Sequence, residues 1–236
     1  MFDRPHHQRT AKFLACLDAE FLAQSGCYFG GGTAIALSLG EYRESVGVDF
    51  LCSSMDGYRA LRNTITNASL GSMLYGPVEL VREVRADRYG IRTFVCVDGV
   101  PIKFEIVSES RIDISGSMNL LFGVPTLSLE DMYAEKLLAN ADRCDDLSML
   151  SRDAIDLAML IGHWGAIPEE AWIKARRPYG ESIDAAYSKA NELLNDSDYL
   201  ASCLKKMHME PALVESIPEL LRSSVPTSKP DCSPTP

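Results

Sequence analysis

The chain has 236 residues, 46% of them hydrophobic, and a formal net charge of −10. This composition supports a folded core and argues against a broad nucleic-acid-coating surface, although a local basic groove can coexist with an acidic body. No stretch approaches the roughly 20 apolar residues of a transmembrane helix and the N-terminus lacks the apolar core of a signal peptide, so we expect no membrane association and a cytoplasmic location.

Cysteine spacing gives no framework for cross-links. The seven cysteines are odd in number, scattered and free of any CxxC pair. Neither a disulfide scaffold nor a zinc site is therefore predicted. We expect most of them to be small buried apolar residues, and Cys232 to be a free thiol.

The first predicted elements surround a run of glycines. Apolar residues at three- and four-residue intervals predict one helix over residues 10–24, followed by a short apolar lead-in at 27–29. Gly30, Gly31 and Gly32 then allow a sharp turn, after which residues 33–39 are predicted to form a helix. Free amides and the helix dipole at such a turn favour phosphate, although a glycine turn before a helix, taken alone, more often reflects ordinary turn chemistry. Neither a P-loop nor a dinucleotide GxGxxG pattern is present.

A single carboxylate marks the next strand. Residues 46–52 are β-branched and apolar around Asp49, which predicts a central strand. An unpaired carboxylate on a buried strand is costly, so we expect Asp49 to be ligated, hydrogen-bonded or exposed at the rim of a site.

The middle of the chain is predicted to be a helix over 55–69 followed by three strands. The strands cover 78–84, 91–97 and 100–107, and Asp98-Gly99 between the last two indicates a hairpin. Alternation places Lys103 and Glu105 on one face of the last strand. That face either lines a functional site or is exposed to solvent.

The remainder is predicted to be helical. After a loop containing Gly116, Gly123 and Pro125, Ser128 is a candidate N-cap for a helix to about residue 143, in which Lys136 would ordinarily be a snorkelling surface residue. Further helices are predicted over 151–163, 169–176, 181–194, 199–207 and 212–223, and the proline-rich tail 225–236 is predicted to be disordered. The predicted organisation is an α/β core over 1–126, a helical region packing on it over 127–224, and the tail.

Three segments, taken in order, resemble one protein family. They are GGGTAIALSLGEYRESVGVDF, SLEDMYAEKLLA and RDAIDLAML, and they are similar to the AbiEii/AbiGii nucleotidyltransferases, the toxin components of bacterial toxin–antitoxin and phage-abortive systems. The resemblance implies an α/β (α+β) fold with a polymerase-β-like core, a small mixed sheet and a C-terminal helical region. It also implies transfer of a nucleoside monophosphate from an NTP to an acceptor hydroxyl.

The resemblance also implies a set of site residues. Gly31, Gly32 and Thr33 would hold the nucleotide phosphates, and Arg43, Ser45 and Asp49 match the family's R-x-S-x-D-x-D pattern. The sequence departs from that pattern at Gly47, where the first metal carboxylate of the family would stand. Asp49 and Glu105 would hold Mg²⁺ or Mn²⁺, and Glu105 would otherwise accept the acceptor's proton. Lys136 would stabilise the departing pyrophosphate, and Asp153 or Asp156 would orient either Lys136 or the site of the base.

Partners follow from the same resemblance. The acceptor could be tRNA or another RNA, a protein or a small molecule, and an antitoxin is an expected protein partner. Two basic clusters could meet RNA or could be salt-paired surface: Arg82, Arg85, Arg88 and Arg92 form the first, and Lys174, Arg176 and Arg177 the second. Loss of the first carboxylate leaves open an alternative, a catalytically degenerate protein that binds nucleotide or a protein partner without transfer.

Overall fold

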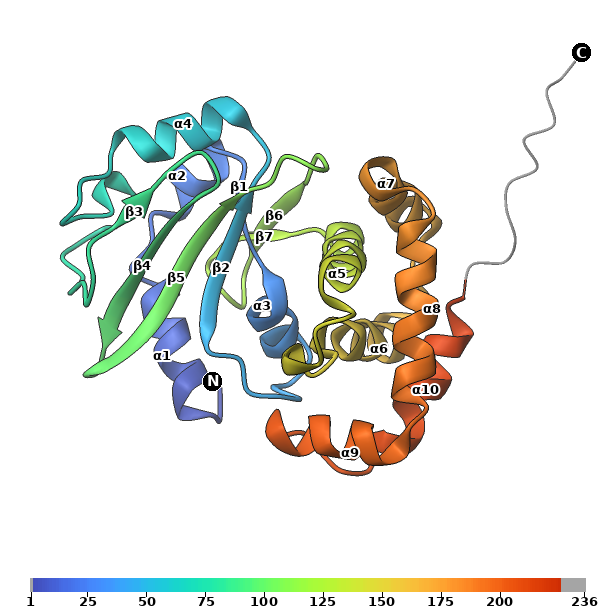
Figure 1. Ribbon diagram of the computed structural model, residues 1–236. Helices are drawn as coiled ribbons and strands as arrows, with labels where there is room; N and C mark the ends of the chain where they lie inside the picture. The colour runs from blue at the N-terminus through green and yellow to red at the C-terminus, as the bar shows by residue number, and fades with distance from the viewer. Residues whose placement is uncertain (1, 226–236) are drawn as a thin grey trace, which may run out of the picture.

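The computed structural model describes residues 2–225 (Figure 1). The predicted disordered tail therefore lies outside the described residues, except for Val225. The strands are β1 (Cys27–Gly30), β2 (Gly47–Cys52), β3 (Arg85–Ala86), β4 (Gly90–Val97), β5 (Val100–Ser108), β6 (Gly116–Asn119) and β7 (Val124–Leu127). The α-helices are α1 (Pro5–Leu14), α2 (Ala19–Gln24), α3 (Gly31–Ser38), α4 (Met55–Asn63), α5 (Leu129–Arg143), α6 (Arg152–Trp164), α7 (Glu169–Tyr179), α8 (Ser182–Leu194), α9 (Ser197–Lys206) and α10 (Leu213–Ser223).

The predicted central strand is β2, the middle strand of one mixed sheet. The strand order is β3-β4-β5-β2-β1-β7-β6, with β2 antiparallel to β1 and parallel to β5. The register places Gly30 opposite Asp49, and Asp49 opposite Glu105. The glycine turn and both predicted metal carboxylates therefore meet at one level of the sheet.

The two faces of the sheet differ because side chains alternate along a strand. Phe50 of β2 and Phe104 of β5 are fully buried, and Phe13 of α1 packs edge-on against Phe104 with ring centroids 5.2 Å apart. This face builds the core under α1. The opposite face carries Asp49 and Glu105, and it is the face that lines the cavity described below.

The hairpin between β4 and β5 is confirmed. Val97 pairs with Val100, and the two turn residues Asp98 and Gly99 have φ of 51° and 76°. Positive φ at both positions is the geometry of a type I′ turn, for which Asp-Gly is a favoured pair. The turn sets the register that places Arg92 of β4 opposite Glu105 of β5.

The single helix predicted over residues 10–24 is wrong. The structure has α1 and α2 instead, because the Asp18 carboxylate accepts a hydrogen bond from the Phe21 N–H at 2.9 Å and starts a new helix. Leu17, between the helices, forms an isolated bridge with Leu74. The helix predicted over 55–69 is also shorter, because α4 ends at Asn63.

Two predictions about strands are wrong. Residues 78–84 do not form a regular strand, because Leu80 makes only an isolated bridge to Val95. Val81 is 49% exposed, so the alternation of apolar residues in this segment does not correspond to one buried face. Conversely, the predicted loop around Gly116 and Pro125 contains β6 and β7. A Cβ at Gly116 would lie 2.2 Å from the Thr126 carbonyl oxygen, so the glycine there permits close strand pairing.

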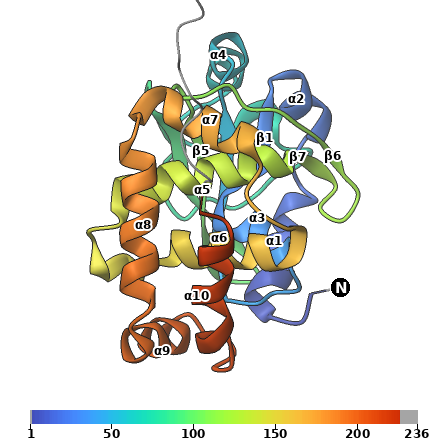
Figure 2. The ribbon, with the colours of Figure 1, turned by 90° about the vertical axis from the view of Figure 1, so that its right-hand side faces the viewer.

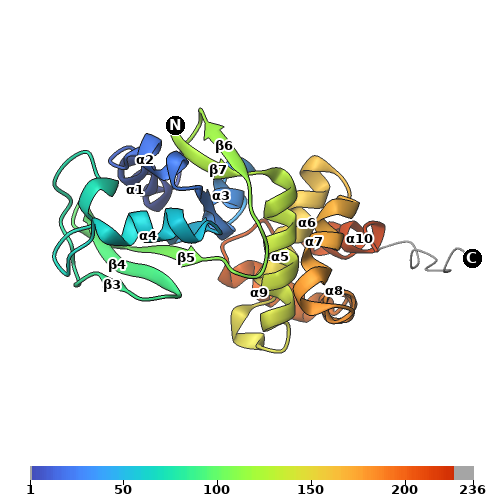
Figure 3. The same cartoon turned by 90° about the horizontal axis from the view of Figure 1, so that it is seen from above.

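The helical region stands beside the sheet (Figures 1 and 3). Helix α5 begins at the predicted cap, since the Ser128 hydroxyl oxygen accepts a hydrogen bond from the Asp131 N–H at 3.1 Å. It packs against α6, α7 and α8, and Trp172 of α7 meets Tyr187 of α8 edge-on at 5.1 Å. Figure 2 shows α8 and α10 side by side, with α9 below them. Within residues 2–225, no helix combines the length and the apolar character needed to cross a bilayer.

Candidate active site

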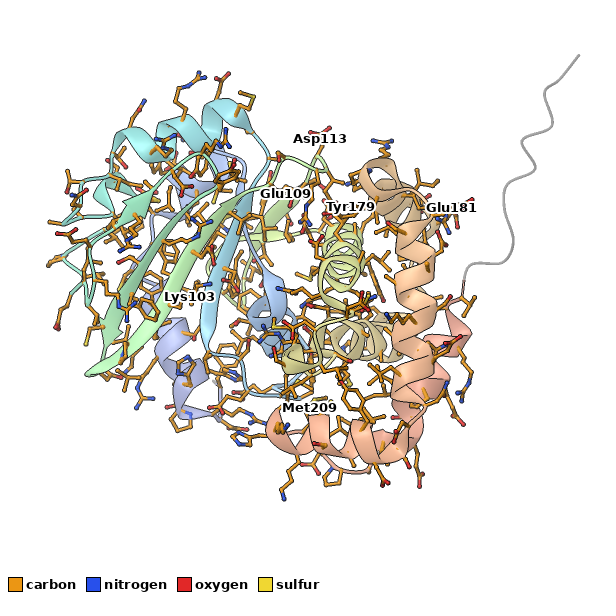
Figure 4. All side chains as sticks on the ribbon, in the orientation of Figure 1. Lys103, Glu109, Asp113, Tyr179, Glu181 and Met209 are labelled. Carbon is orange, nitrogen blue, oxygen red and sulfur yellow. The ribbon has the colours of Figure 1, made fainter. Side chains whose placement is uncertain are left out.

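A cavity of about 450 Å³ lies between the polar face of the sheet and helix α5. Its walls come from the glycine turn, the 43–47 loop, β2, β5, α5 and the start of α6. Figure 4 labels Lys103, near the start of β5, and Glu109, which follows the last residue of that strand. Lys103 lines the cavity. The predicted site residues that line the cavity are Gly31, Gly32, Arg43, Ser45, Asp49, Glu105, Lys136 and Asp153. Thr33 lies behind this wall.

The glycine turn closely approaches two side chains. Gly31 has φ of +67°, and a Cβ there would lie 3.1 Å from the Asp49 carboxylate. A Cβ on Gly32 would lie 2.1 Å from Nη2 of Arg43. Only glycine therefore lets the start of α3 pass between Asp49 and Arg43, which leaves the first amides of the helix at the cavity.

Asp49 is a half-buried carboxylate whose oxygens have no hydrogen bond or ion pair to any other residue in the described range 2–225. Burial raises its pKa, and the charge of Glu105 raises it further, whereas Lys103 opposes the shift. A carboxylate left in this state gains from a cation in the cavity.

Glu105 stands next to Asp49 but is already paired. Its carboxylate accepts a hydrogen bond from Nε of Arg92 at 2.6 Å and another from the Lys103 ammonium. Burial alone would raise the pKa of Glu105, but these two cations lower it below its ordinary value. Because the Lys103 side chain is 48% exposed, this partner can exchange with solvent or with a ligand.

Lys136 is buried, so the alternative of a snorkelling surface lysine is wrong. Its ammonium donates to Oδ1 of Asp153 at 2.9 Å and lies 2.6 Å from Oδ2 of Asp156. Burial would lower its pKa, but the two carboxylates raise it, so the side chain is charged. Arg143 also donates to Asp153, at 2.7 Å. The structure thus places both carboxylates of the R-D-x-x-D segment on Lys136.

Asp156 lies behind the cavity wall and joins three elements. Arg43 donates to its two oxygens at 2.7 and 2.9 Å, and the Tyr42 hydroxyl donates at 2.5 Å. Despite complete burial, the charges of Arg43 and Lys136 hold the pKa of Asp156 well below its usual range. This carboxylate therefore fixes the loop before β2 against α5 and α6.

Thr33 and Ser45 brace the loop from inside. The Thr33 hydroxyl lies 2.7 Å from the Ser45 hydroxyl and donates to the Gly47 carbonyl oxygen at 2.5 Å. The Ser45 N–H donates to Nε2 of His7 at 3.1 Å, and Nδ1 of His7 contacts the Glu41 carboxylate at 2.7 Å. A neutral His7 with its proton on Nδ1 satisfies both contacts.

We expect acid to loosen this brace. Burial lowers the pKa of His7 below 6.5, although Glu41 opposes the shift and Arg4 and His6 add to it. As pH falls below 6.5, the unfolded chain takes up a proton at His7 before the folded protein does, so stability declines. In thermal denaturation at pH 7.5 and 5.5, His7→Gln should lose less Tm on acidification than the natural protein. A variant of the exposed His163, His163→Gln, should behave like the natural protein; an unchanged acid response in His7→Gln would contradict the assignment.

Several cavity residues were not predicted from the sequence. Arg143 follows Lys136 by seven positions, two helical turns, so helical spacing could have indicated it. Arg152 opens α6 and makes no ion pair within residues 2–225. Arg111 and Glu135 meet only through tertiary packing, with Nη2 of Arg111 at 3.1 Å from Oε2 of Glu135. No spacing rule connects a loop residue to a helix 24 positions later.

The two predicted basic clusters are neutralised only in part, through Arg92, Lys174 and Arg176. Arg92 pairs with Glu105, Lys174 donates to Asp131 at 2.5 Å, and Arg176 donates to Asp184 at 2.6 Å. Arg82 lies over the Phe94 ring, 4.8 Å from its centroid. Neither cluster lines the cavity, whose α5 and α6 side instead carries Lys136, Arg143 and Arg152.

The residues fit one divalent cation better than two. Asp49 supplies an uncompensated carboxylate, and Glu105 stands beside it, although its oxygens are held by Arg92 and Lys103. Among residues 2–225, no group of three or more His, Cys, Asp or Glu side chains is arranged to hold a metal. Mg²⁺ often uses one or two carboxylates and completes its shell with water and phosphate oxygens, which suits Asp49. A two-ion clamp would need more carboxylates than these.

Known proteins share this architecture. A Helicobacter pylori protein described as a candidate nucleotidyltransferase is 17% identical, with a TM-score of 0.50 and 92% of each chain covered. JHP933 from Helicobacter pylori is 16% identical, with a TM-score of 0.53, 94% of this chain and 92% of that chain covered. At these identities the likeness shows the fold. No curated protein matches the chain at a significant level.

Membership of a family rests on the sequence itself. Residues 12–222 match the family model described as "Nucleotidyl transferase AbiEii toxin, Type IV TA system". That match includes the glycine turn, both strands that carry Asp49 and Glu105, and the helices that carry Lys136 and Asp153. The chain therefore belongs to the AbiEii nucleotidyltransferase toxin family of type IV toxin–antitoxin systems.

Proposed function

We propose that this protein transfers a nucleoside monophosphate from a nucleoside triphosphate to an acceptor hydroxyl, with Mg²⁺ or Mn²⁺ as cofactor. The observation that supports this most directly is the distribution of charge around the cavity. Asp49, whose carboxylate has no partner among residues 2–225, lies beside the open glycine turn, and Lys136, Arg143 and Arg152 line the side formed by α5 and α6. A divalent cation bound to a nucleoside triphosphate would be attracted to the carboxylate of the first side, and the phosphates would be attracted to the cations of the second.

The phosphates would lie between the turn and the cations. Gly31 and Gly32 offer backbone N–H groups at the start of α3, where the helix dipole favours negative charge. Lys136 has three N–H donors and contacts two carboxylates, so one donor remains for a phosphate oxygen. Arg43, fixed by Asp156, would add charge behind the turn.

A divalent cation, when bound at Asp49, would neutralise the phosphates and polarise the α-phosphorus. The acceptor oxygen forms a bond to that phosphorus while the bond to the bridging oxygen breaks and pyrophosphate leaves. Lys136 stabilises the charge that develops on pyrophosphate, and Asp153 holds Lys136 and Arg143 in place. Glu105 would accept the proton of the acceptor hydroxyl. Its lowered pKa makes it a weak base, but phosphoryl transfer relies mainly on positioning and charge.

The acceptor and partners are proposed on family grounds. An RNA such as tRNA, a protein or a small molecule could supply the hydroxyl, and the membership of a type IV system supports an antitoxin as partner in the bacterial cytoplasm. An RNA would meet this protein at cations that have no ion pair within residues 2–225. These are Arg152 at the cavity and, from the two basic clusters, Arg82, Arg85, Arg88 and Arg177.

One observation favours a second candidate, a degenerate protein that binds nucleotide or an antitoxin without transfer. Gly47 occupies the position of the family's first metal carboxylate. A Cβ there would lie 3.6 and 3.7 Å from the two Asp49 carboxylate oxygens, an ordinary contact distance. A carboxylate would therefore fit beside Asp49 without strain, yet this chain has none.

The substitution Gly47→Asp tests both candidates. We expect its second carboxylate to tighten Mg²⁺ binding about 10- to 100-fold, because even residues outside the ligand set change metal affinity on that scale. Transfer would be measured from each α-labelled nucleoside triphosphate, with Mg²⁺ or Mn²⁺, into total tRNA and into the protein itself. The matched control is Gly76→Asp, which adds a carboxylate at an open loop position outside the cavity.

The outcomes separate the candidates. Incorporation by the natural sequence supports the proposed transfer, and a lower Mg²⁺ requirement in Gly47→Asp alone supports the metal position. Incorporation only by Gly47→Asp indicates a degenerate natural protein. No incorporation by either form and no nucleotide-dependent rise in Tm would contradict both the proposed transfer and nucleotide binding by a degenerate protein, and would leave only the antitoxin-binding form of the second candidate.

A further inference from the structure

The cavity wall becomes apolar immediately beyond Asp49 and Glu105. The next inward-facing positions are Leu51 on β2 and Val107 on β5, since side chains alternate along each strand. Leu127, at the end of β7, joins them: a Cβ on Gly30 would touch both Leu51 and Leu127, so these two side chains adjoin. Together with Met132 from α5 they form an aliphatic slot beside the proposed phosphate site.

One polar side chain lines this part of the cavity and lacks a full set of partners. Glu135 lies on α5, three residues after Met132, and is only 8% exposed. Its Oε2 accepts a hydrogen bond from Nη2 of Arg111 at 3.1 Å. Its Oε1 is buried and has no hydrogen-bond partner within residues 2–225. A buried carboxylate oxygen without a donor is costly, which points to a donor that arrives with a ligand.

Arg111 does not supply a donor to Oε1. Arg111 divides its guanidinium among Glu135, Glu109 and Asp142, and two of its nitrogens already bind Glu109. Burial, followed by the charge of Glu109, raises the pKa of Glu135 to about 8, and a hydrogen bond between the two carboxyl groups adds to the shift, so Glu135 shares a proton with Glu109 at neutral pH. Arg111 therefore fixes the orientation of Glu135 without completing its hydrogen bonds.

We propose that this slot is the nucleobase subsite and that Oε1 of Glu135 accepts a hydrogen bond from an exocyclic amino group of the base. The assignment rests on the proposed nucleotidyl transfer and narrows its substrate class. An aliphatic slot suits the flat face of a base better than a ribose, which needs several polar partners. An unprotonated carboxyl oxygen accepts from an amino group and repels a carbonyl. With the proton of Glu135 held against Glu109, bases with an amino group at this edge are favoured over those with a carbonyl.

Paired nucleotides test this directly by binding rather than turnover. Calorimetric affinities with Mg²⁺ would be compared within three pairs that differ at an amino group: CTP with UTP, ATP with ITP, and GTP with ITP. We expect at least one amino-bearing member to bind about tenfold or more tightly, because its counterpart leaves Oε1 unpaired. Glu135→Gln should reduce that preference to within about twofold, since an amide can also donate to a carbonyl.

The control is Glu130→Gln, which changes a 40% exposed carboxylate on the same helix and should retain the preference of the natural protein. Equal affinities within every pair would overturn the subsite while leaving nucleotide binding intact. A uniform loss for all nucleotides in Glu135→Gln would also overturn it, because it would place Glu135 on the sugar or the phosphates. Failure of every nucleotide to bind would instead remove the proposed function itself. The pair comparison on the natural protein decides the matter even if the variant does not fold.

Discussion

Replacement of Asp49 by asparagine is expected to reduce nucleotidyl transfer about 100- to 1,000-fold, the cost of removing a group aimed at charge that develops in the transition state. The same substitution should leave the Tm unchanged or raise it. Burial raises the pKa of Asp49 above the 3.8 of an ordinary aspartate, so the ionised side chain destabilises the folded protein at neutral pH. Asparagine removes that charge and keeps the shape.

The measurement combines initial rates of label transfer at saturating nucleotide and Mg²⁺ with thermal denaturation in the absence of nucleotide. Asp56→Asn provides the control, because its side chain on α4 is 91% exposed and lies outside the cavity. A rate that stays within about threefold of the natural protein would show that Asp49 does not carry the metal. A fall of several degrees in Tm would show that Asp49 is held by contacts that stabilise the fold.

Local chemistry made part of the fold predictable. Asp98-Gly99 between two alternating runs is a strong signal for a tight hairpin, and Ser128 before an apolar run is a signal for a helix cap. Both elements appear where the sequence places them. The failures arise where tertiary context decides. Apolar residues from α1 and α2 share a helical period across the break that Asp18 introduces, and the pairing of β6 with β7 overrides the glycines and Pro125.

The site divides in the same way. Asp49 could be identified because a lone carboxylate in an apolar strand is unusual. Glu105 was predicted from the family resemblance, and the sheet register places the two side by side. Lys136 resembles a surface lysine until α6 and its two carboxylates pack over it. Glu135 gives no signal in the sequence, since Glu-Lys on a helix is an ordinary solvated pair. Its significance comes from burial and an empty hydrogen-bond position, which only the folded arrangement defines.

Asp156→Asn is expected to lower the free energy of unfolding by about 3–5 kcal/mol, the range found when one partner of a buried ion pair is removed. The side chain is fully buried and holds Arg43, Tyr42 and Lys136 together. An amide cannot balance two buried cations, so both would be left uncompensated. Urea denaturation at pH 7 measures the loss, and Asp145→Asn, whose exposed pair with Lys189 contributes about 0–1 kcal/mol, is the control.

Acid provides an independent check on the same carboxylate. Because Arg43 and Lys136 overcome the effect of burial and hold the pKa of Asp156 far below 3.8, its ionised form stabilises the fold fully above pH 3.8. That contribution is lost as pH falls from 3.8 through the lower folded-state value. Asp156→Asn should therefore show a shallower decline in stability below pH 3.8 than the natural protein. Equal slopes, or a loss below about 1 kcal/mol at pH 7, would mean that Arg43 and Lys136 find other partners and that Asp156 does not hold the site together.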